Sequence, residues 1–229
     1  MTASLLMIAS RKPTAGQTKT RLGREVGMER AALLYRAFLK DLSDRFSPRC
    51  SRDYALAWAY TPESRPFEDV VPGDIYVCQQ GESWSERQTN LLRWGADAGY
   101  AKVVLTASDS PQMSRAMVDD AFAALESTDV VLGRVHDGGY YLVGTQGFHD
   151  VLTGVPMSTP SAADALIARA QTLGLRVTEV ERTFDVDIAA DLLLLVDHLR
   201  RDACAAPATL QALQDLHLEP KIAILDHAP

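Results

Sequence analysis

The sequence is poor in cysteine and has no long apolar run. Its three cysteines, Cys50, Cys78 and Cys204, are far apart and odd in number, and no Cys-x-x-Cys or Cys/His cluster occurs. This pattern argues against a disulfide framework and a zinc site, and it predicts a reducing, cytoplasmic setting. No stretch approaches the roughly 18 to 20 apolar residues of a membrane span, so we expect no membrane partner.

An excess of positive charge is also absent. The chain has 23 Lys and Arg against 30 Asp and Glu, which gives a net charge of −7. Proteins that bind duplex nucleic acid usually present a positive face, so we expect no nucleic-acid partner. An acidic chain with one local basic cluster suits a small anionic ligand better than a polymer.

Short apolar runs alternate with amphipathic stretches along the chain. Strands are expected at 5–9, 55–59, 75–78, 103–107, 130–132, 140–143 and 175–180, and helices at 28–46, 85–98, 114–125, 160–173 and 188–199. Strands separated by helices predict crossover connections and an α/β fold with a mostly parallel sheet. Ligands of such sheets bind at the carboxyl ends of strands, so functional residues are expected just after strands. The tail after Pro207 is weakly patterned.

A basic loop follows the first expected strand. Residues 10–22 read SRKPTAGQTKTRL and contain the cations Arg11, Lys12, Lys19 and Arg21. Lysine and arginine neutralise phosphate charge, and a glycine lets the backbone approach, so the loop is a plausible polyphosphate cradle. It is not a Walker loop, because two residues separate Gly16 from Lys19. The simpler interpretation is a solvated charged loop.

Two groups of aspartates lie beside expected elements. Asp109 follows the strand at 103–107, and Asp185 and Asp187 precede the last helix. If 184–187 is extended, Asp185 and Asp187 share one face. Mg²⁺ typically uses one or two carboxylates plus substrate phosphates, and these residues would supply them. The alternatives are that Asp109 begins a turn and that Asp187 is a helix N-cap.

A glycine pair marks a third candidate segment, Asp137-Gly138-Gly139-Tyr140. Two glycines before aromatic residues allow a tight turn or a close approach to a ligand. Asp137 could orient an acceptor hydroxyl or act as a base. The segment could equally be a plain hairpin turn.

Five motifs in order carry a family resemblance. They are KPTAGQTKTRL (12–22), SDSP (108–111), DGGYYLVG (137–144), MSTP (157–160) and FDVDIAADL (184–192). Together they resemble the nucleotide-diphospho-sugar transferase superfamily of GT-A fold. The set is most similar to the bacterial arsenosugar-biosynthesis-type glycosyltransferases associated with radical-SAM/selenodomain proteins. The layout is also related to that of phospholactate guanylyltransferase.

The resemblance implies a three-layer, Rossmann-like α/β fold with helices on both faces of the sheet. It implies a single domain over 1–229, with a core at about 4–200 and a C-terminal extension at about 203–229. The implied cofactor is Mg²⁺ or Mn²⁺. The implied roles are phosphate binding for Lys12, Lys19 and Arg21; metal binding for Asp109 and Asp187, with Asp185 as a further candidate; and an acceptor side formed by Asp137, Gly138, Gly139 and Tyr140.

The implied activity is glycosyl transfer from a nucleotide-sugar to a small-molecule acceptor. The alternative is nucleotidyl transfer, in which a phosphorylated acceptor attacks an NTP and releases pyrophosphate. The segment 81–87, GESWSER, departs from the Gly-Asp-Leu-Gly-Glu-Arg of many relatives. That departure motivates a third hypothesis, a nucleotide-binding protein that has lost catalysis. A homodimer is left open.

Overall fold

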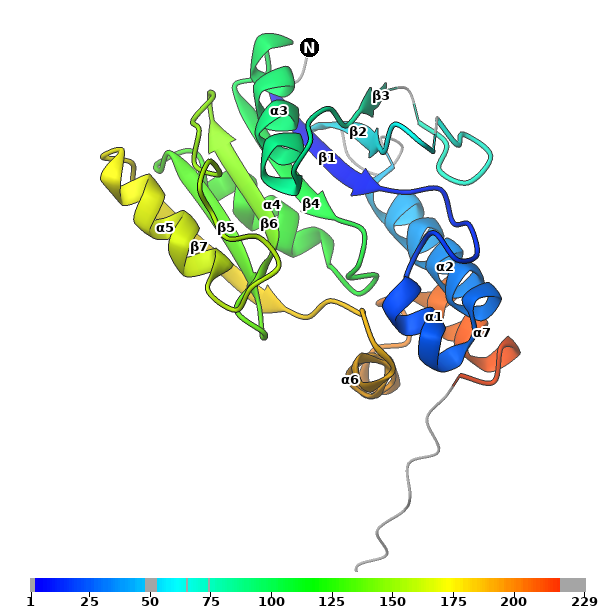
Figure 1. Cartoon of the computed structure of the whole chain (residues 1–229). Coiled ribbons are helices and arrows are strands. Elements are labelled where there is room, and N and C mark those ends of the chain that lie inside the picture. The colour runs from blue at the N-terminus through cyan, green and yellow to red at the C-terminus, as the bar shows by residue number, and fades with distance from the viewer. Residues whose placement is uncertain (1–2, 48–52, 65, 74, 219–229) are drawn as a thin grey trace, which may run out of the picture.

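Seven strands of the described residues form one sheet in the order β3-β2-β1-β4-β6-β5-β7 (Figure 1). The computed structural model describes residues 3–47, 53–64, 66–73 and 75–218, so Cys50 and the end of the expected C-terminal extension lie outside it. The strands are β1 (Ser4–Ser10), β2 (Ala55–Tyr60), β3 (Ile75–Cys78), β4 (Lys102–Ala107), β5 (Val130–Val135), β6 (Tyr140–Gln146) and β7 (Val177–Thr183). Only β6 runs antiparallel to its neighbours in this sheet.

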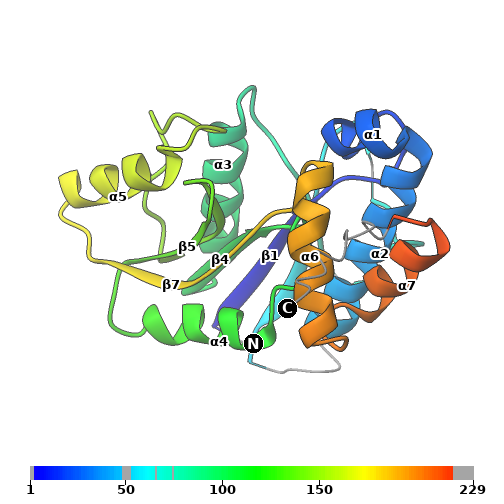
Figure 2. The same ribbon diagram turned by 90° about the horizontal axis from the view of Figure 1, so that it is seen from below.

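Helices cover both faces of the sheet, as the two views in Figures 1 and 2 show. One face carries α3 (Trp84–Asp97) and α5 (Ala162–Thr172). The other carries α1 (Thr20–Val26), α2 (Met28–Phe46), α4 (Arg115–Ala124), α6 (Ala189–Arg201) and α7 (Pro207–Asp215). The mostly parallel, three-layer α/β fold predicted from the sequence is confirmed.

The alternation of side chains along β1 explains the two layers. Leu6 and Ile8 belong to the apolar cluster on the α2 face, whereas Leu5 and Met7 belong to the cluster on the α3 face. All four are fully buried. Successive side chains of a strand point to opposite faces, so a continuous apolar run is what a strand covered on both faces requires.

The antiparallel strand β6 brings a hairpin turn to the functional edge of the sheet. It lies between β4 and β5, and its residue Leu142 pairs with Thr106 near the carboxyl end of β4. The turn that enters β6 therefore lies at the same edge as the carboxyl ends of β1 and β4. This placement brings the segment 136–139 close to the loops that follow β1 and β4.

Two helices were not predicted, and both are short. α1 has seven residues and α7 has nine, which is too little chain for a persistent apolar periodicity. The expected strand at 175–180 is shifted to Val177–Thr183. The other predicted elements lie within a few residues of their expected bounds.

Two further findings concern the cysteines and the apolarity of the helices. Cys78 and Cys204 are free. Within the described ranges, no helix combines the length and the apolarity needed to cross a membrane.

A buried carboxylate fixes α7 to the rest of the fold. Asp41 of α2 is 2% exposed. It accepts hydrogen bonds from the backbone N–H of Ala208 at 2.9 Å and of Thr209 at 2.7 Å, and from the Thr209 hydroxyl at 2.6 Å. A carboxylate at a helix N-terminus satisfies otherwise unpaired N–H groups and interacts favourably with the helix dipole.

We predict that Asp41→Ala lowers the free energy of unfolding by about 3 kcal/mol, because it leaves several buried donors without an acceptor. Urea unfolding monitored by circular dichroism measures the change. The matched control is Asp44→Ala on the same helix, which removes an exposed pair with Lys40 and should cost less than about 0.5 kcal/mol. Equal losses in the two variants would contradict the assignment.

Candidate active site

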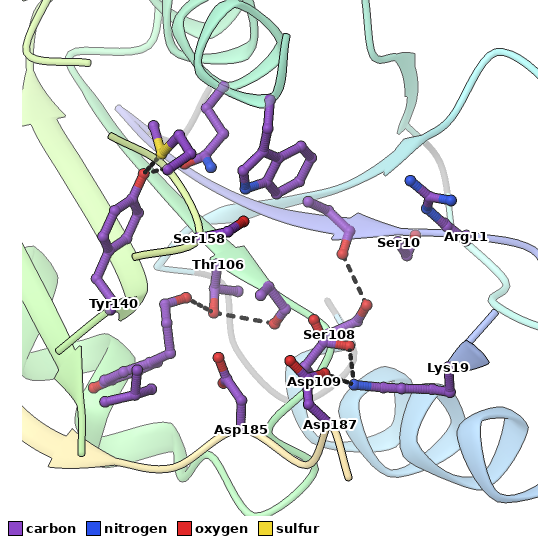
Figure 3. Close-up of a pocket in the computed structure, with 18 of the residues that line it drawn as sticks. Ser10, Arg11, Lys19, Thr106, Ser108, Asp109, Tyr140, Ser158, Asp185 and Asp187 are labelled. Atoms are coloured by element: carbon purple, nitrogen blue, oxygen red, sulfur yellow. Dashed lines mark hydrogen bonds and ion pairs between the residues drawn. The ribbon is translucent and has the colours of Figure 1, made fainter. Parts of the chain in front are cut away.

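A cleft of about 650 Å³ opens at the carboxyl edge of the sheet. Its walls come from the loop after β1, the ends of β4 and β5, the β5–β6 turn, the start of α3, the segment before α5 and the segment between β7 and α6 (Figure 3). Among the predicted site residues, Lys19, Arg21, Asp109, Asp137, Gly139, Tyr140, Asp185 and Asp187 line it. The sequence prediction that these segments meet at one edge is therefore supported by the geometry.

The basic loop is held in shape by Thr18, which is 4% exposed. The Thr18 hydroxyl accepts a hydrogen bond from the backbone N–H of Thr14 at 2.8 Å and lies within hydrogen-bond distance of the carbonyl oxygens of Lys12 and Thr14. Gly16 has a φ of 75°, a backbone conformation that glycine adopts without steric cost. Lys19 then turns the chain into α1 with a φ of 48°. The loop thus presents Lys19 from a fixed backbone.

The Lys19 ammonium is buried between two carboxylates. Its Nζ lies 2.6 Å from Oδ1 of Asp109 and 2.9 Å from Oδ1 of Asp187. The Lys19 side chain is 5% exposed, whereas those of Asp109 and Asp187 are 36% and 45% exposed. Arg21 reaches the other oxygen of Asp187 at 3.4 Å. Figure 3 shows Lys19 pointing from its loop toward the two aspartates.

The charges in this cluster shift one another's protonation. Burial alone would lower the pKa of Lys19, but the charges of Asp109 and Asp187 outweigh it and raise that pKa. Burial alone would raise the pKa of Asp187, but Lys19 and Arg21 lower it. Both effects favour the ionised pair, because an opposite charge in contact stabilises the charged form of each group.

Asp185 differs from its neighbours because, among the described residues, it forms no ion pair with the Lys19 that contacts Asp109 and Asp187. Its Oδ1 accepts a hydrogen bond from the Ser110 hydroxyl at 2.6 Å. Burial, followed by repulsion from Asp109, raises the pKa of Asp185 to about 7. The two loops are joined here, since the N–H of Val186 donates to the carbonyl of Asp109 at 3.0 Å.

Tyr35 of α2 contacts both the loop after β1 and the loop after β4. Its hydroxyl lies 2.7 Å from Oγ of Ser108 and accepts from the N–H of Arg11 at 3.2 Å. The Ser108 hydroxyl in turn donates to the carbonyl of Ala9 at 2.8 Å. Burial, followed by the charge of Asp109, raises the pKa of Tyr35 to about 12, so the phenol stays neutral. Tyr35 therefore connects the ends of β1 and β4 through a neutral hydroxyl.

The opposite wall is built around the β5–β6 turn. Asp137 is exposed, and its Oδ1 accepts from the N–H of Gly139 at 3.0 Å. The Tyr140 hydroxyl donates to Oε1 of Gln88 at 3.0 Å, and burial raises the pKa of this phenol. Gly138 has a φ of 92°, and a Cβ there would collide with the backbone carbonyl of Pro160. Gly138 thus serves close packing of two backbones and is not among the residues that line the cleft.

Lys12 also lies away from the cleft wall. Its side chain is exposed, and its backbone N–H donates to Oγ of Ser64 at 3.2 Å. Its proposed contact with phosphate stays a prediction. Arg11, which was noted in the basic loop but not assigned a role, does line the cleft.

Sequence reasoning missed several polar and aromatic groups that line the cleft, namely Ser10, Tyr35, Gln79, Trp84 and Gln88. Ser10 and Gln79 are 3% and 1% exposed, yet within the described part of the chain the Ser10 hydroxyl and the Gln79 Oε1 have no hydrogen-bond partner. Buried polar atoms are rarely left unpaired without a reason, and a ligand is one such reason. Ser10 is the last residue of β1, and Gln79 directly follows β3. This position at the end of a strand is the only signal that the sequence offered for the two residues.

The unusual segment 81–87 has a structural explanation. Ser83 caps α3, accepting from the N–H of Glu86 at 3.1 Å, while the Glu86 carboxylate accepts from the N–H groups of Glu82 and Ser83. This reciprocal arrangement is a capping box. Of the segment, only Trp84 lines the cleft. The change from the pattern of relatives therefore affects the start of α3 and brings a tryptophan to the site.

The aspartates fit a divalent ion in their chemistry. Carboxylate oxygens are the ligands Mg²⁺ prefers, and it commonly takes one or two of them plus phosphate oxygens. Asp109 and Asp187 already share one cation, the Lys19 ammonium. In the described ranges, no three His, Cys, Asp or Glu side chains are grouped so as to hold a metal by themselves. The carboxylates of Asp109 and Asp187 would supply only part of the coordination of such an ion.

Comparisons with known proteins agree with this fold. The family model described as an uncharacterized protein conserved in bacteria (DUF2064) matches residues 49–159, just under half of the chain. A structure from Desulfovibrio desulfuricans, provisionally assigned as a nucleotide-diphospho-sugar transferase, is 28% identical over 94% of this chain and 97% of its own, with a TM-score of 0.84. No curated protein matches by sequence.

More distant structures share the fold. CMP:2-keto-3-deoxy-manno-octonic acid synthetase complexed with CTP is 12% identical over 87% of this chain and 99% of its own, with a TM-score of 0.53. The 4-diphosphocytidyl-2C-methyl-D-erythritol synthase from Anaerococcus prevotii is 12% identical over 86% of this chain and 96% of its own, with a TM-score of 0.52. At these identities the likeness concerns the fold alone.

The raised pKa of Asp185 predicts a pH-dependent stability in the absence of metal and nucleotide. Between the ordinary pKa near 4 and the folded value of about 7, the folded state keeps a proton that the unfolded state has lost, so stability falls as pH rises. Asp185→Asn removes this loss and should raise Tm by several degrees at about pH 8, with little change near pH 4. Thermal melts in chelator measure it. A gain of the same size at both pH values would contradict the assignment.

Proposed function

We propose that the protein is a transferase that uses a nucleotide-sugar as donor and passes the sugar to a small, uncharged acceptor. The observation that carries the proposal is the division of the cleft. In the described chain, all the cationic side chains that line it, Arg11, Lys19 and Arg21, come from the loop after β1 and the first turn of α1. The opposite wall, around Tyr140 and Ser158, contributes no lysine or arginine from the described chain. Figure 3 shows Arg11 and Lys19 on one side and Tyr140 on the other.

The cationic side suits a diphosphate. Lysine and arginine neutralise phosphate oxygens, and fixed positive groups at a leaving group stabilise the charge that develops on it. The unpartnered Ser10 hydroxyl and Gln79 carbonyl offer a donor and an acceptor for a polar part of the nucleotide. The provisional assignment of the Desulfovibrio desulfuricans protein, at 28% identity, supports the same donor class.

The uncharged side suits a sugar and a neutral acceptor. The neutral Tyr140 phenol and the Gln88 amide provide hydrogen-bonding groups, and Trp84 provides an aromatic surface at the start of α3. In the proposed reaction the bond between the anomeric carbon and the diphosphate oxygen breaks, and the acceptor oxygen bonds to that carbon. The Asp137 carboxylate takes the proton of the acceptor hydroxyl, and the nucleoside diphosphate leaves with the electron pair.

A divalent ion, when bound, would neutralise charge on the departing diphosphate. Asp109 and Asp187 would hold it, with Asp185 as a further oxygen ligand close by. The chain's own part is to place these oxygens at the carboxyl ends of β4 and β7, next to the basic loop. We propose the whole described chain as one such nucleotide-binding domain, with α7 as an integral helix because Asp41 caps it.

Nucleotidyl transfer is the second candidate, and one observation favours it. Three cations in the loop after β1 and the first turn of α1 would also suit a triphosphate, which carries more charge than a diphosphate. A phosphorylated acceptor, however, would lie against the wall that has no cation. The two reactions release different products, a nucleoside diphosphate or pyrophosphate, so product analysis separates them.

The proposal predicts that a nucleotide-sugar with Mg²⁺ raises Tm more than an NTP does, because a ligand that binds only the folded state stabilises it. A panel of nucleotide-sugars, NDPs and NTPs, with Mg²⁺ or with chelator, measures this. Preferential stabilisation by one NTP would favour nucleotidyl transfer instead. An unchanged Tm with every nucleotide at saturating concentration would overturn both glycosyl transfer and nucleotidyl transfer. It would leave no support for an enzyme of this class.

For a donor found in that panel, we predict that Asp109→Asn and Asp137→Asn each lower kcat by roughly 10²- to 10³-fold. Asp109→Asn should also remove the dependence on Mg²⁺, whereas Asp137→Asn should keep it. The matched control is Asp97→Asn at the exposed end of α3, outside the cleft. Full activity in both cleft variants would show that the roles are assigned to the wrong residues.

A further inference from the structure

The position of the Lys19 ammonium conflicts with that of a bound metal. Its Nζ lies within 2.9 Å of one oxygen from each of Asp109 and Asp187. A Mg²⁺ ion bound to the same oxygens would lie about 2.0 to 2.1 Å from each of them. Two cations bound to the same two oxygens would lie close together and repel each other. Metal and ammonium therefore compete for this position.

The ammonium cannot simply be pushed aside. The Lys19 side chain is 5% exposed, and within the described chain its ammonium contacts these two carboxylates. A buried charge that loses its partners costs several kcal/mol, so metal alone would have to overcome that penalty. A flexible four-carbon stem on a fixed backbone allows the ammonium to swing, but only toward a new anion.

We infer that Lys19 is a resident cation that closes the Asp109–Asp187 position in the ligand-free protein and leaves it for the donor's phosphates, so that divalent metal and nucleotide phosphate bind in concert. This inference rests on the proposed function. The phosphate gives the ammonium a new partner, and its departure frees two carboxylates for the metal. Arg21, which is 67% exposed, contacts Asp187 from the solvent side and can follow the phosphate as well.

The scheme has a reciprocal consequence. If phosphate raises the affinity for metal, metal must raise the affinity for phosphate by the same factor. A second consequence is that removing the positive side chain of Lys19 should create a metal site. Lys19→Met keeps the length of the stem but leaves both carboxylates without the ammonium.

The test measures Mn²⁺ binding by electron paramagnetic resonance, with no nucleotide present. Wild type should bind Mn²⁺ weakly, and Lys19→Met should bind it at least about tenfold more tightly. The matched control is Lys12→Met, which removes the same charge from the same loop at an exposed position without contact to the aspartates. It should stay within about twofold of wild type, because distant exposed charges are screened. Adding Asp187→Asn to Lys19→Met should abolish the gain.

Melting temperatures give a second readout of the same idea. Mg²⁺ alone and pyrophosphate alone should each change the Tm of wild type little. The two together should raise that Tm by more than the sum of the separate changes. Mg²⁺ alone should stabilise Lys19→Met. Circular dichroism confirms that the variant is folded. Equal Mn²⁺ affinities of wild type and Lys19→Met would overturn the inference. The Mn²⁺ comparison uses no nucleotide, so its failure is distinguishable from failure of the proposed function.

Discussion

The burial of one ammonium group between two carboxylates organises the whole carboxyl edge of this sheet. Lys19, Asp109 and Asp187 come from the loop after β1, the loop after β4 and the segment after β7. Removing charges from water is costly, and the cost is offset only where partners are close and well placed. The three segments are therefore held in register by a polar contact, and Thr18, Tyr35 and the bond from Val186 to Asp109 fix the backbones around it.

Much of the fold could be predicted from sequence because the signals were local and strong. The strand at 103–107 is a short apolar run rich in β-branched residues, and the helix at 28–46 shows an apolar stripe over several turns. α1 and α7 could not be predicted, since each is short and depends on tertiary contacts such as the Asp41 cap. The antiparallel direction of β6 follows from its pairing with β4, which no local pattern encodes.

The candidate site was predictable in part. The basic loop after the first strand indicated Lys19, and carboxylates after a strand and before a helix indicated Asp109 and Asp187. Nothing indicated that Lys19 would lie between the other two. That contact joins residues distant in sequence, and residue types alone do not distinguish a metal ligand from an ion-pair partner. For Gln79 the only signal was its position directly after β3. Its importance arises from burial without a partner for its Oε1, a property of the packed structure rather than of the residue.

The contact between Gly138 and Pro160 has a mechanical consequence for the uncharged wall. The two backbones touch so closely that no side chain fits between them, and the N–H of Ala163 donates to the carbonyl of Gly138 at 3.2 Å. The β5–β6 turn and the start of α5 must then shift together as one rigid piece. The backbone of this wall can change shape only if both segments move together. Without such movement, its outline changes through the side chains that the segments carry, such as Ser158 and Thr159. The outline of this wall should therefore evolve through side-chain exchange on a stiff frame.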